Sequence, residues 1–566
     1  MGELFKRLKA YPSVTLELLG ATFFANVLAL ASPLFVMQVL NRYVSHGVDS
    51  TLFTLTAGVL IAIIFEVGFR QIRLNVASAL SQPFDRVNSR GVFDVLTGAR
   101  ADILAQMTPG QKREAAAAAD AIQQAYAAPN LTAYLDLPFA AMFLLALMIL
   151  SPPLALIAIV FVALAIGLGA LNLKAMRGPT EKIQSQMAAR QGLLDSAITD
   201  PDTVRAFTAD VFLRKRWAVV QDALDKVRAV LTARQGAGQN LTQGLQAVMS
   251  TSVIATGAML VVTGHLDVGL LIGANILAAR TLGPVIRITQ TVGQMANAKT
   301  ARETLENLMR LPREMRRGSA LGVYKGGVEL KDMGFAYPGQ SVPLFESVSI
   351  KLEPGSIFVV SGMNGSGKTT MARLLAGLLV PSRGQILVDG VELSQVAPEW
   401  WRRQIVYLPQ EPGFFSGTVR ENIAAYSPDL SEEGLNTVIR DAGLEAFFST
   451  SRDGFEMVLQ AGGRNLPLGI RRRLALARAL ASDGRLVIMD EPTEGLDGEG
   501  VQQIGRVMNA LSQKGCTIIA LSHDVNIIKG APRILDLNVK PVPRLLVVKK
   551  PDAGAPANSS TVKEGA

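Results

Sequence analysis

The long apolar runs in the first 300 residues constrain the fold more than any other feature. Six windows have about 20 residues each and few charges, which is enough helix to cross a hydrocarbon layer of about 30 Å. They lie near residues 16–40, 52–72, 132–150, 153–173, 242–263 and 266–284. Buried helices of a large soluble domain are the alternative, but these rarely run so long with so few charges. Charged residues make up 18% of the chain, against about 25% in soluble proteins. We therefore predict an α-helical membrane domain with six transmembrane helices.

Lysine and arginine predict the orientation of these helices. The segment 73–131 carries six basic residues and the segment 174–241 carries eleven, whereas the opposite loops carry only Arg42. Because basic residues concentrate in cytoplasmic loops, we expect both long segments and both termini in the cytoplasm. The net charge of +9 could also indicate nucleic-acid binding, but six spans exclude a soluble protein that handles nucleic acid, and we expect contact with membrane lipid and none with nucleic acid. Residues 1–11 are basic and amphipathic, which predicts a helix on the inner membrane face.

The chain changes character after the last apolar window. We predict a membrane domain over 1–300 with long cytoplasmic helical extensions, and a polar linker over 301–324 into which the last helix runs out. From 325 to 540, short β-rich runs alternate with helical ones, which is typical of an α/β domain. The tail, 541–566, is rich in Pro, Ala, Ser and Lys and is predicted to be disordered. Cys516 is the only cysteine, which excludes a disulfide scaffold.

A glycine-rich loop between a β run and a helical run predicts a phosphate-binding site. Residues 356–370 read SIFVVSGMNGSGKTT, with the pattern Gly-x-x-x-x-Gly-Lys-Thr in the context of strand, loop and helix. Glycines let backbone N–H groups turn towards phosphate oxygens, and the start of the helix adds partial positive charge. Lys368 is expected to reach the β- and γ-phosphates of a nucleotide, and the Thr369 hydroxyl to bind Mg²⁺. The predicted nucleotide-binding residues of the loop are Gly362, Met363, Asn364, Gly365, Ser366, Gly367, Lys368, Thr369 and Thr370.

Three polar residues at the ends of later apolar runs complete the predicted chemistry. Residues 485–493 read RLVIMDEPT, so Asp490 is placed to bind the metal and Glu491 to act as the general base on the attacking water. An Asp-Glu pair at a strand end is common at surfaces, but a phosphate loop upstream favours the catalytic interpretation. His523 ends the run TIIALSH, and we predict that it contacts the γ-phosphate and is not an ordinary surface histidine.

These residues, with three further motifs, resemble the ATPase domain of ABC transporters over residues 325–540. The motifs are Phe335-Ala336-Tyr337-Pro338, Tyr407-Leu408-Pro409-Gln410 and the exporter-type segment FSGTVRENI at 415–423. The resemblance implies that Tyr337 stacks on adenine and that Gln410 contacts both the metal and the attacking water. It implies an α/β P-loop ATPase fused to the membrane domain, with ATP and Mg²⁺ as cofactors.

The membrane half resembles the exporters of bacterial type I secretion systems. The resemblance rests on ASPLFVMQVLNR at 31–42, DLPFAAMFLLALMILSP at 136–152 and VGLLIGANILAARTLGPV at 268–285. It implies an inner-membrane half-transporter that dimerises and works with a periplasmic adaptor and an outer-membrane channel to secrete a polypeptide. Some relatives carry an N-terminal peptidase-like domain, which we do not expect here because the first apolar window begins near residue 16. The alternatives are a multidrug or lipid exporter half, and a catalytically weak regulatory half.

Two departures from the family pattern concern the segments that face a partner subunit. The family signature is Leu-Ser-Gly-Gly-Gln, whereas residues 466–480 here read LPLGIRRRLALARAL, so only Leu466 and Gly469 match. In the family this segment caps the ATP of the opposite subunit; proline lacks an N–H, and the leucine side chain obstructs close approach. We therefore favour a heterodimer with a partner that has an intact signature, and keep a slow homodimer as the alternative. The second departure is Glu494, where the family usually has serine.

Overall fold

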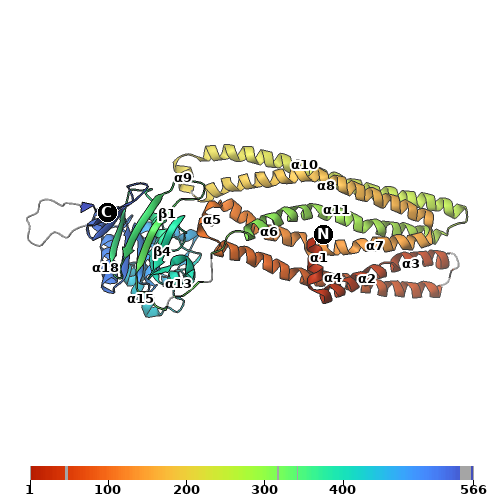
Figure 1. The fold of residues 1–566 in the computed structure, drawn as a ribbon. Helices are drawn as coiled ribbons and strands as arrows, with labels where there is room; N and C mark the ends of the chain where they lie inside the picture. The colour runs from red at the N-terminus through yellow and green to blue at the C-terminus, as the bar shows by residue number, and fades with distance from the viewer. Residues whose placement is uncertain are drawn as a thin grey trace, which may run out of the picture. The chain divides into compact units, whose positions relative to one another are not determined.

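The computed structural model describes residues 2–44, 47, 49–199, 201–314, 318–320, 322–340, 342–547 and 563–564. The chain folds as two compact units, which are described separately (Figure 1). The first contains residues 1–99 and 106–311, and the second contains residues 100–105 and 312–566.

The first unit is a bundle of helices, and six of its segments are long and apolar enough to cross a membrane. Four of the six predicted windows lie within these segments, and the windows 242–263 and 266–284 extend beyond theirs by only one and two residues, so the prediction of six spans is confirmed. The helices are α1 (Gly2–Ala10), α2 (Pro12–Leu28), α3 (Ala31–Gln38), the π-helical η1 (Val39–Val44), α4 (Asp49–Gly98), α6 (Pro109–Ala125), α7 (Ala128–Leu150), α8 (Pro152–Thr199), α9 (Pro201–Ala206), α10 (Asp210–Val262) and α11 (Val268–Met309).

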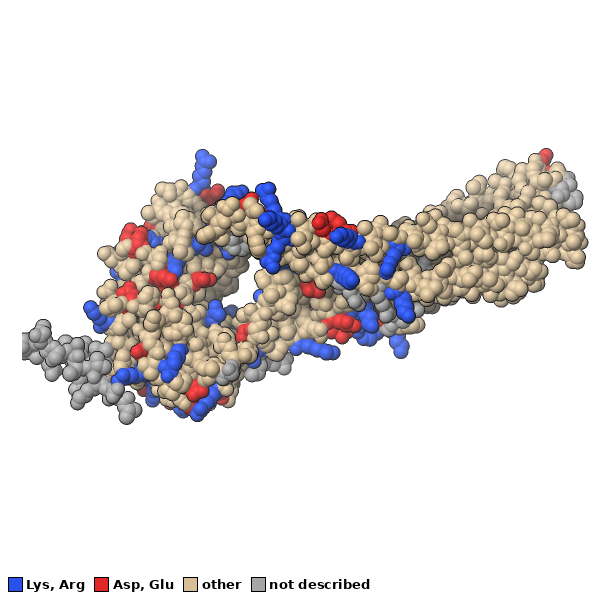
Figure 2. Space-filling model, turned by 90° about the horizontal axis from the view of Figure 1, so that it is seen from above, with Lys and Arg blue, Asp and Glu red and all other residues tan. Residues whose placement is uncertain are grey.

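Four of these helices are much longer than a bilayer requires. α4, α8, α10 and α11 contain 50, 48, 53 and 42 residues, and at about 1.5 Å per residue the shortest spans about 60 Å. Figure 2 shows that the end of the bundle at which α7 turns into α8 presents almost no charged side chains, whereas lysine and arginine gather further along the helices. The helices therefore continue beyond the apolar layer, as the sequence predicted.

A buried ion cluster joins four helices of the bundle. Asp136 on α7 is only 3% exposed, and its carboxylate accepts hydrogen bonds from Arg73 on α4 at 2.5 Å and Asn26 on α2 at 3.0 Å. Arg287 on α11 lies 3.4 Å from the second carboxylate oxygen. Because an unpaired charge is costly in an apolar bundle, the arginines and Asp136 stabilise one another and fix the packing of the four helices.

The helix α1 packs against the bundle through an inward-facing arginine. Arg7 is fully buried, its guanidinium lies 4.5 Å from the ring centroid of Tyr126 and 5.2 Å from that of Phe84, and it hydrogen-bonds Asp85. The predicted helix over residues 1–11 is present, but this basic residue contacts protein where we expected a membrane surface. Guanidinium groups stack on aromatic rings, which explains how the bundle accommodates the charge.

The second unit contains a parallel sheet, as the alternating runs predicted. Its strands β11, β3, β10, β9 and β6 are neighbours in that order and run parallel, and antiparallel β12 joins the edge at β11. Alternate side chains enter two apolar cores, with Ile488 in one and Val487 and Met489 in the other. Since both faces are covered, the strands are continuous apolar runs. The strands are β3 (Ile357–Ser361), β6 (Ile405–Leu408), β9 (Leu486–Asp490), β10 (Thr517–Leu521), β11 (Arg533–Asp536), β12 (Arg544–Val547) and the short β13 (Lys563–Glu564).

An antiparallel sheet in the order β2-β1-β4-β5 and a two-stranded sheet, β7-β8, complete the strands of the unit. These strands are β1 (Val328–Phe335), β2 (Phe345–Leu352), β4 (Arg383–Val388), β5 (Val391–Glu392), β7 (Gly417–Thr418) and β8 (Val458–Leu459). The α-helices are α5 (Ala101–Gln106), α12 (Lys368–Leu375), α13 (Pro398–Arg403), α14 (Val419–Ala424), α15 (Glu432–Asp441), α16 (Glu445–Thr450), α17 (Leu468–Leu480), α18 (Gly498–Gln513) and α19 (Val525–Lys529). Three short 3₁₀ turns, η2 (Leu393–Gln395), η3 (Gly454–Glu456) and η4 (Ala461–Gly463), lie among the described residues of this unit, and η4 is kinked at Gly462.

Two expected boundaries of this unit are corrected by the structure. Arg544–Val547 pairs with β11, so the ordered domain continues past residue 540 into the predicted disordered tail. Of residues 548–566, only Lys563 and Glu564 are among the described residues. At the other end, α11 runs to Met309, and Tyr324 is 2% exposed in the core beside Trp401. The helix end within the predicted linker over 301–324 was expected, whereas the core position of Tyr324 was not, so the ATPase unit begins before residue 325.

Candidate nucleotide-binding site

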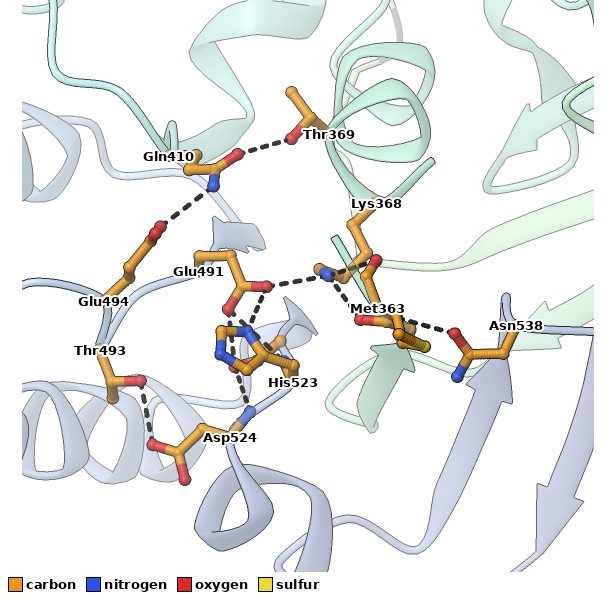
Figure 3. Close-up of polar contacts among 12 residues, drawn as sticks. Met363, Lys368, Thr369, Gln410, Glu491, Thr493, Glu494, His523, Asp524 and Asn538 are labelled. Atoms are coloured by element: carbon orange, nitrogen blue, oxygen red, sulfur yellow. Dashed lines mark hydrogen bonds and ion pairs between the residues drawn. The ribbon is translucent and has the colours of Figure 1, made fainter. Parts of the chain in front are cut away.

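The predicted site residues meet where three parallel strands end. The phosphate loop follows β3, Asp490 is the last residue of β9, and Ser522 and His523 follow β10. Ligands of open α/β sheets bind outside the carboxyl ends of the strands. The strand order places β10 between β3 and β9, which brings segments more than 120 residues apart in sequence into one site (Figure 3).

The phosphate loop has the backbone geometry that its glycines allow. Gly365 and Gly367 have φ angles of +81° and +109°, which disfavour other residues. A Cβ on Gly362 would lie 2.3 Å from the Ser366 hydroxyl, so a side chain would not fit there. Helix α12 begins at Lys368, whose ammonium donates to the carbonyl oxygens of Gly362 at 2.5 Å and Met363 at 3.2 Å.

Glu491 is the centre of the polar contacts in Figure 3. Its carboxylate lies 3.0 Å from the Lys368 ammonium and 2.9 Å from His523 Nδ1, and accepts a hydrogen bond from the Ser522 hydroxyl at 3.1 Å. Burial alone would raise the pKa of Glu491, but hydrogen bonds from His523 and Lys368 outweigh it and hold that pKa below its ordinary value. The residue has a φ of +49°, a conformation that costs free energy and that clusters at functional sites.

The burial and the contacts of Asp490 are those expected of a metal ligand. It is fully buried, and neither carboxylate oxygen has a hydrogen-bond partner among the described residues. Burial raises the pKa of Asp490 to about 6; the nearby Thr369 hydroxyl opposes this rise, and the neighbouring charge of Glu491 adds to it. A buried carboxylate without a partner is costly unless it binds a cation. Hard oxygen donors are the ligands that Mg²⁺ prefers, so the residues present fit the predicted metal.

Thr369 and Gln410 lie together, as the metal prediction requires. The Thr369 hydroxyl donates to the amide oxygen of Gln410 at 3.1 Å, and the amide nitrogen of Gln410 donates to Glu494 at 3.0 Å. Tyr337 contacts the same helix, because its hydroxyl lies 2.9 Å from the Thr370 hydroxyl. The structure thus brings the sequence-predicted residues of the site together, and their individual roles stay predictions.

Sequence reasoning missed two residues that hold the phosphate loop from the far end of the chain. The Met363 N–H donates to the Asn538 side chain at 2.8 Å, and the Lys540 ammonium donates to the carbonyl oxygens of Ser366 and Leu344 at 2.6 Å each. No sequence signal marked them, because they follow β11 in a segment without a motif.

The degenerate signature forms a helix start without a side-chain cap. Pro467 precedes α17 and makes no capping hydrogen bond, and Leu468, the first helical residue, is 43% exposed. A serine at the same place would offer a hydroxyl. The folded domain therefore presents no serine hydroxyl and no N–H of residue 467 at the start of α17.

Comparison with known families identifies the chain. A family model described as ABC transporter matches residues 345–494, and one described as ABC transporter transmembrane region matches residues 16–285. The chain is an ABC transporter. Its site is the nucleotide site of the family, so the protein is an ATP-binding, ATP-hydrolysing transporter with a multi-pass membrane domain.

Curated relatives and a solved structure narrow the class of ABC transporter. The chain is 27% identical to the toxin RTX-I translocation ATP-binding protein of Actinobacillus pleuropneumoniae over 526 residues, 93% of this chain and 74% of that protein. It is 28% identical to the leukotoxin translocation ATP-binding protein of Mannheimia haemolytica, with the same shares covered. A bacterial Atm1-family ABC exporter solved with ATP bound superposes with a TM-score of 0.81 at 19% identity, covering 93% of this chain and 94% of that one. The predicted fold class, six transmembrane helices fused to an α/β P-loop ATPase, is confirmed, and the protein is an ABC exporter.

Proposed function

We propose that this ABC exporter secretes a polypeptide as the ATPase and permease component of a type I secretion system in a bacterial inner membrane. The observation that carries the proposal is the similarity to two toxin translocation proteins, which extends over 93% of the chain and so includes the membrane half. The ATPase domain would lie in the cytoplasm, because basic residues concentrate in the loops on its side. A periplasmic adaptor and an outer-membrane channel would be its partners.

The contacts of the site support separate roles for its residues in ATP hydrolysis. The phosphate loop and Lys368 bind the phosphates, and Tyr337 supports adenine. Glu491, held ionised by its neighbours, accepts the proton of the attacking water, while His523 orients Glu491 and contacts the γ-phosphate. Thr369, Gln410 and Asp490 would hold Mg²⁺, which neutralises charge on the β- and γ-phosphate oxygens when bound.

Lys368 must change partners when ATP binds. In the structure its ammonium contacts Glu491 and two loop carbonyl oxygens, and it lies buried at 6% exposure. Phosphate oxygens would replace the carboxylate as its anionic partner. Glu491 would then be released to act on water, so binding of ATP would itself prepare the base.

A deletion experiment, read out as the polypeptides present in the culture medium, tests the proposal. In the bacterium that carries this chain, deletion of its coding sequence should remove one or a few polypeptides from the culture medium. The unmodified chain should restore them, and the Glu491→Gln variant should not. Unchanged secretion, with increased sensitivity to small toxic compounds or altered membrane lipid, would instead favour the multidrug or lipid exporter.

A specific observation favours a heterodimer as the working unit. The chain carries the phosphate loop, Asp490 and Glu491 of its own half of a site, whereas the start of α17 offers neither a serine hydroxyl nor, at Pro467, an N–H to cap a partner's ATP. Each hydrogen bond to a charged group contributes about 1.5–3 kcal/mol, or about 10- to 100-fold in affinity or rate. We propose that a partner with an intact signature completes the ATP site on this chain. The partner's own ATP site, which faces Pro467 and Leu468, would then be the catalytically weak one.

The ATPase activity of the chain purified alone tests this second proposal. A slow rate that rises when Ser, Gly and Gln are restored at 467, 468 and 470 is expected. Turnover typical of exporters by a symmetric dimer, unchanged by the restoration, would contradict the heterodimer.

A further inference from the structure

The acidic residue that replaces the family's usual serine after the catalytic glutamate lies in the site. Glu494 accepts a hydrogen bond from the Gln410 amide nitrogen at 3.0 Å, and Gln410 in turn accepts one from Thr369 at 3.1 Å (Figure 3). The same carboxylate oxygen of Glu494, Oε2, also lies 3.5 Å from the Arg472 guanidinium. A continuous polar chain therefore joins a residue of α17 to the predicted metal ligands.

The hydrogen bonds of Gln410 to Glu494 and Thr369 determine which end of the Gln410 amide faces the metal site. A carboxylate accepts hydrogen bonds and cannot donate them, so Glu494 attracts the NH₂ group and leaves the amide oxygen for Thr369. Only the oxygen end can bind a cation. A serine at 494 has a shorter side chain that can donate as well as accept, and would not impose this orientation.

The loop around Glu494 is itself held in place. The Glu494 N–H donates to the Glu491 carbonyl oxygen at 3.2 Å, and Thr493 donates to Asp524 at 3.0 Å. Gly495 has a φ of +65°, and a Cβ there would lie 3.3 Å from the Arg472 guanidinium, so a glycine lets the arginine pass close to the backbone. The Arg472 side chain is only 14% exposed, which restricts its motion.

We propose that Glu494 is a positioning residue that fixes the Gln410 amide with its oxygen towards the Mg²⁺ site, and that Arg472 anchors Glu494. The proposal rests on the proposed role of Gln410 as a metal ligand. Residues that orient a ligand through a hydrogen bond typically change metal affinity 10- to 100-fold when they are replaced. Glu494 is 40% exposed, so the expected effect is at the lower end, about tenfold.

Metal binding by the full-length protein in detergent tests the proposal. Mn²⁺ serves as the probe, and its affinity in the presence of ADP is measured by electron paramagnetic resonance, separately from activity. Glu494→Ser should weaken Mn²⁺ binding about tenfold. Glu494→Gln should stay within about threefold of the unmodified protein, because its amide oxygen can still accept from Gln410. Arg472→Gln should give an intermediate loss.

Two controls separate orientation of the ligand from general damage. Affinity for ADP in the presence of EDTA should be the same in all variants, because the proposed role requires the metal. Glu499→Ala, five residues further on and exposed at the start of α18, should bind Mn²⁺ normally. Equal Mn²⁺ affinity for Glu494→Ser and the unmodified protein, or an equal loss of ADP affinity without metal, would overturn the proposal while leaving the proposed function intact. Failure of the unmodified protein to bind ADP at all would overturn both.

Discussion

Glu491→Gln separates the two tasks that the structure gives to this carboxylate. The side chain is 2% exposed and contacts both Lys368 and His523, so glutamine, which has the same shape, should leave the packing intact. An amide cannot accept the proton of the attacking water. We therefore expect ATP to bind and hydrolysis to fail.

The magnitudes follow from the contacts. Loss of a general base lowers turnover by about 10²- to 10⁴-fold. ATP affinity should rise although turnover falls, because in the variant the Lys368 ammonium no longer has to leave a carboxylate when ATP binds. Two unit charges 3.0 Å apart attract by about 5 kcal/mol at an effective dielectric constant of about 20. Desolvation of the two buried groups offsets most of this attraction, so we expect a net gain of about 1 kcal/mol, or about fivefold tighter binding of ATP.

Turnover and equilibrium binding of a fluorescent ATP analogue, both measured on the full-length protein, check the two magnitudes. Glu499→Gln is the matched control, since it makes the same chemical change at an exposed position of α18 and should alter neither quantity. Unchanged turnover with normal ATP binding would remove Glu491 from the catalytic role. Weaker ATP binding would refute the exchange of partners by Lys368.

Three further predictions concern topology and stability. A cysteine at His265 should react with a membrane-impermeant reagent added outside spheroplasts and one at Gln111 should not, with little background from the buried Cys516; the reverse pattern would refute the orientation. Asp490→Asn should raise the free energy of unfolding in EDTA at pH 7.5 by about 2–3 kcal/mol, because the folded-state pKa of about 6 lies above the ordinary value and the buried anion is destabilising above it; the difference in Tm should shrink as the pH falls from 6 to 4, and a pH-independent difference would contradict this cause. Arg7→Gln should lower the free energy of unfolding by about 3 kcal/mol, seen as a lower Tm in detergent, because it removes the buried guanidinium from Phe84 and Tyr126 and leaves the half-buried Asp85 carboxylate unpaired; an unchanged Tm would show that the α1 contact is not stabilising.

The sequence predicted the elements of this protein because their signals are local. A span needs about 20 apolar residues in a row, and the turn between α7 and α8 at Ser151 is marked by Pro152 and Pro153. The phosphate loop is a contiguous motif whose glycines have a single physical purpose. The residues that meet it follow apolar runs, so the carboxyl ends of parallel strands predicted where they gather.

Contacts between distant side chains could not be predicted. Gln410 and Glu494 are 84 residues apart, and Met363 and Asn538 are 175 residues apart, and neither pair has a pattern that names its partner. The inward position of Arg7 was missed for a related reason, since an amphipathic basic helix suits a membrane surface as well as a protein groove lined by aromatic rings. The sequence of a helix shows which of its faces is polar, but not whether lipid or protein contacts that face.

The contacts of Asn538 and Lys540 with the phosphate loop set an order of events during synthesis. The chain is made from the N-terminus, so all six membrane spans and the loop itself leave the ribosome before these two residues do. Strand β11 and the fully buried Leu537 also arrive at the end, although β3 needs β11 as its neighbour. The nucleotide pocket is therefore completed only after the permease half is available for insertion, and a nascent exporter lacks the contacts that hold its phosphate loop until Asn538 and Lys540 have left the ribosome.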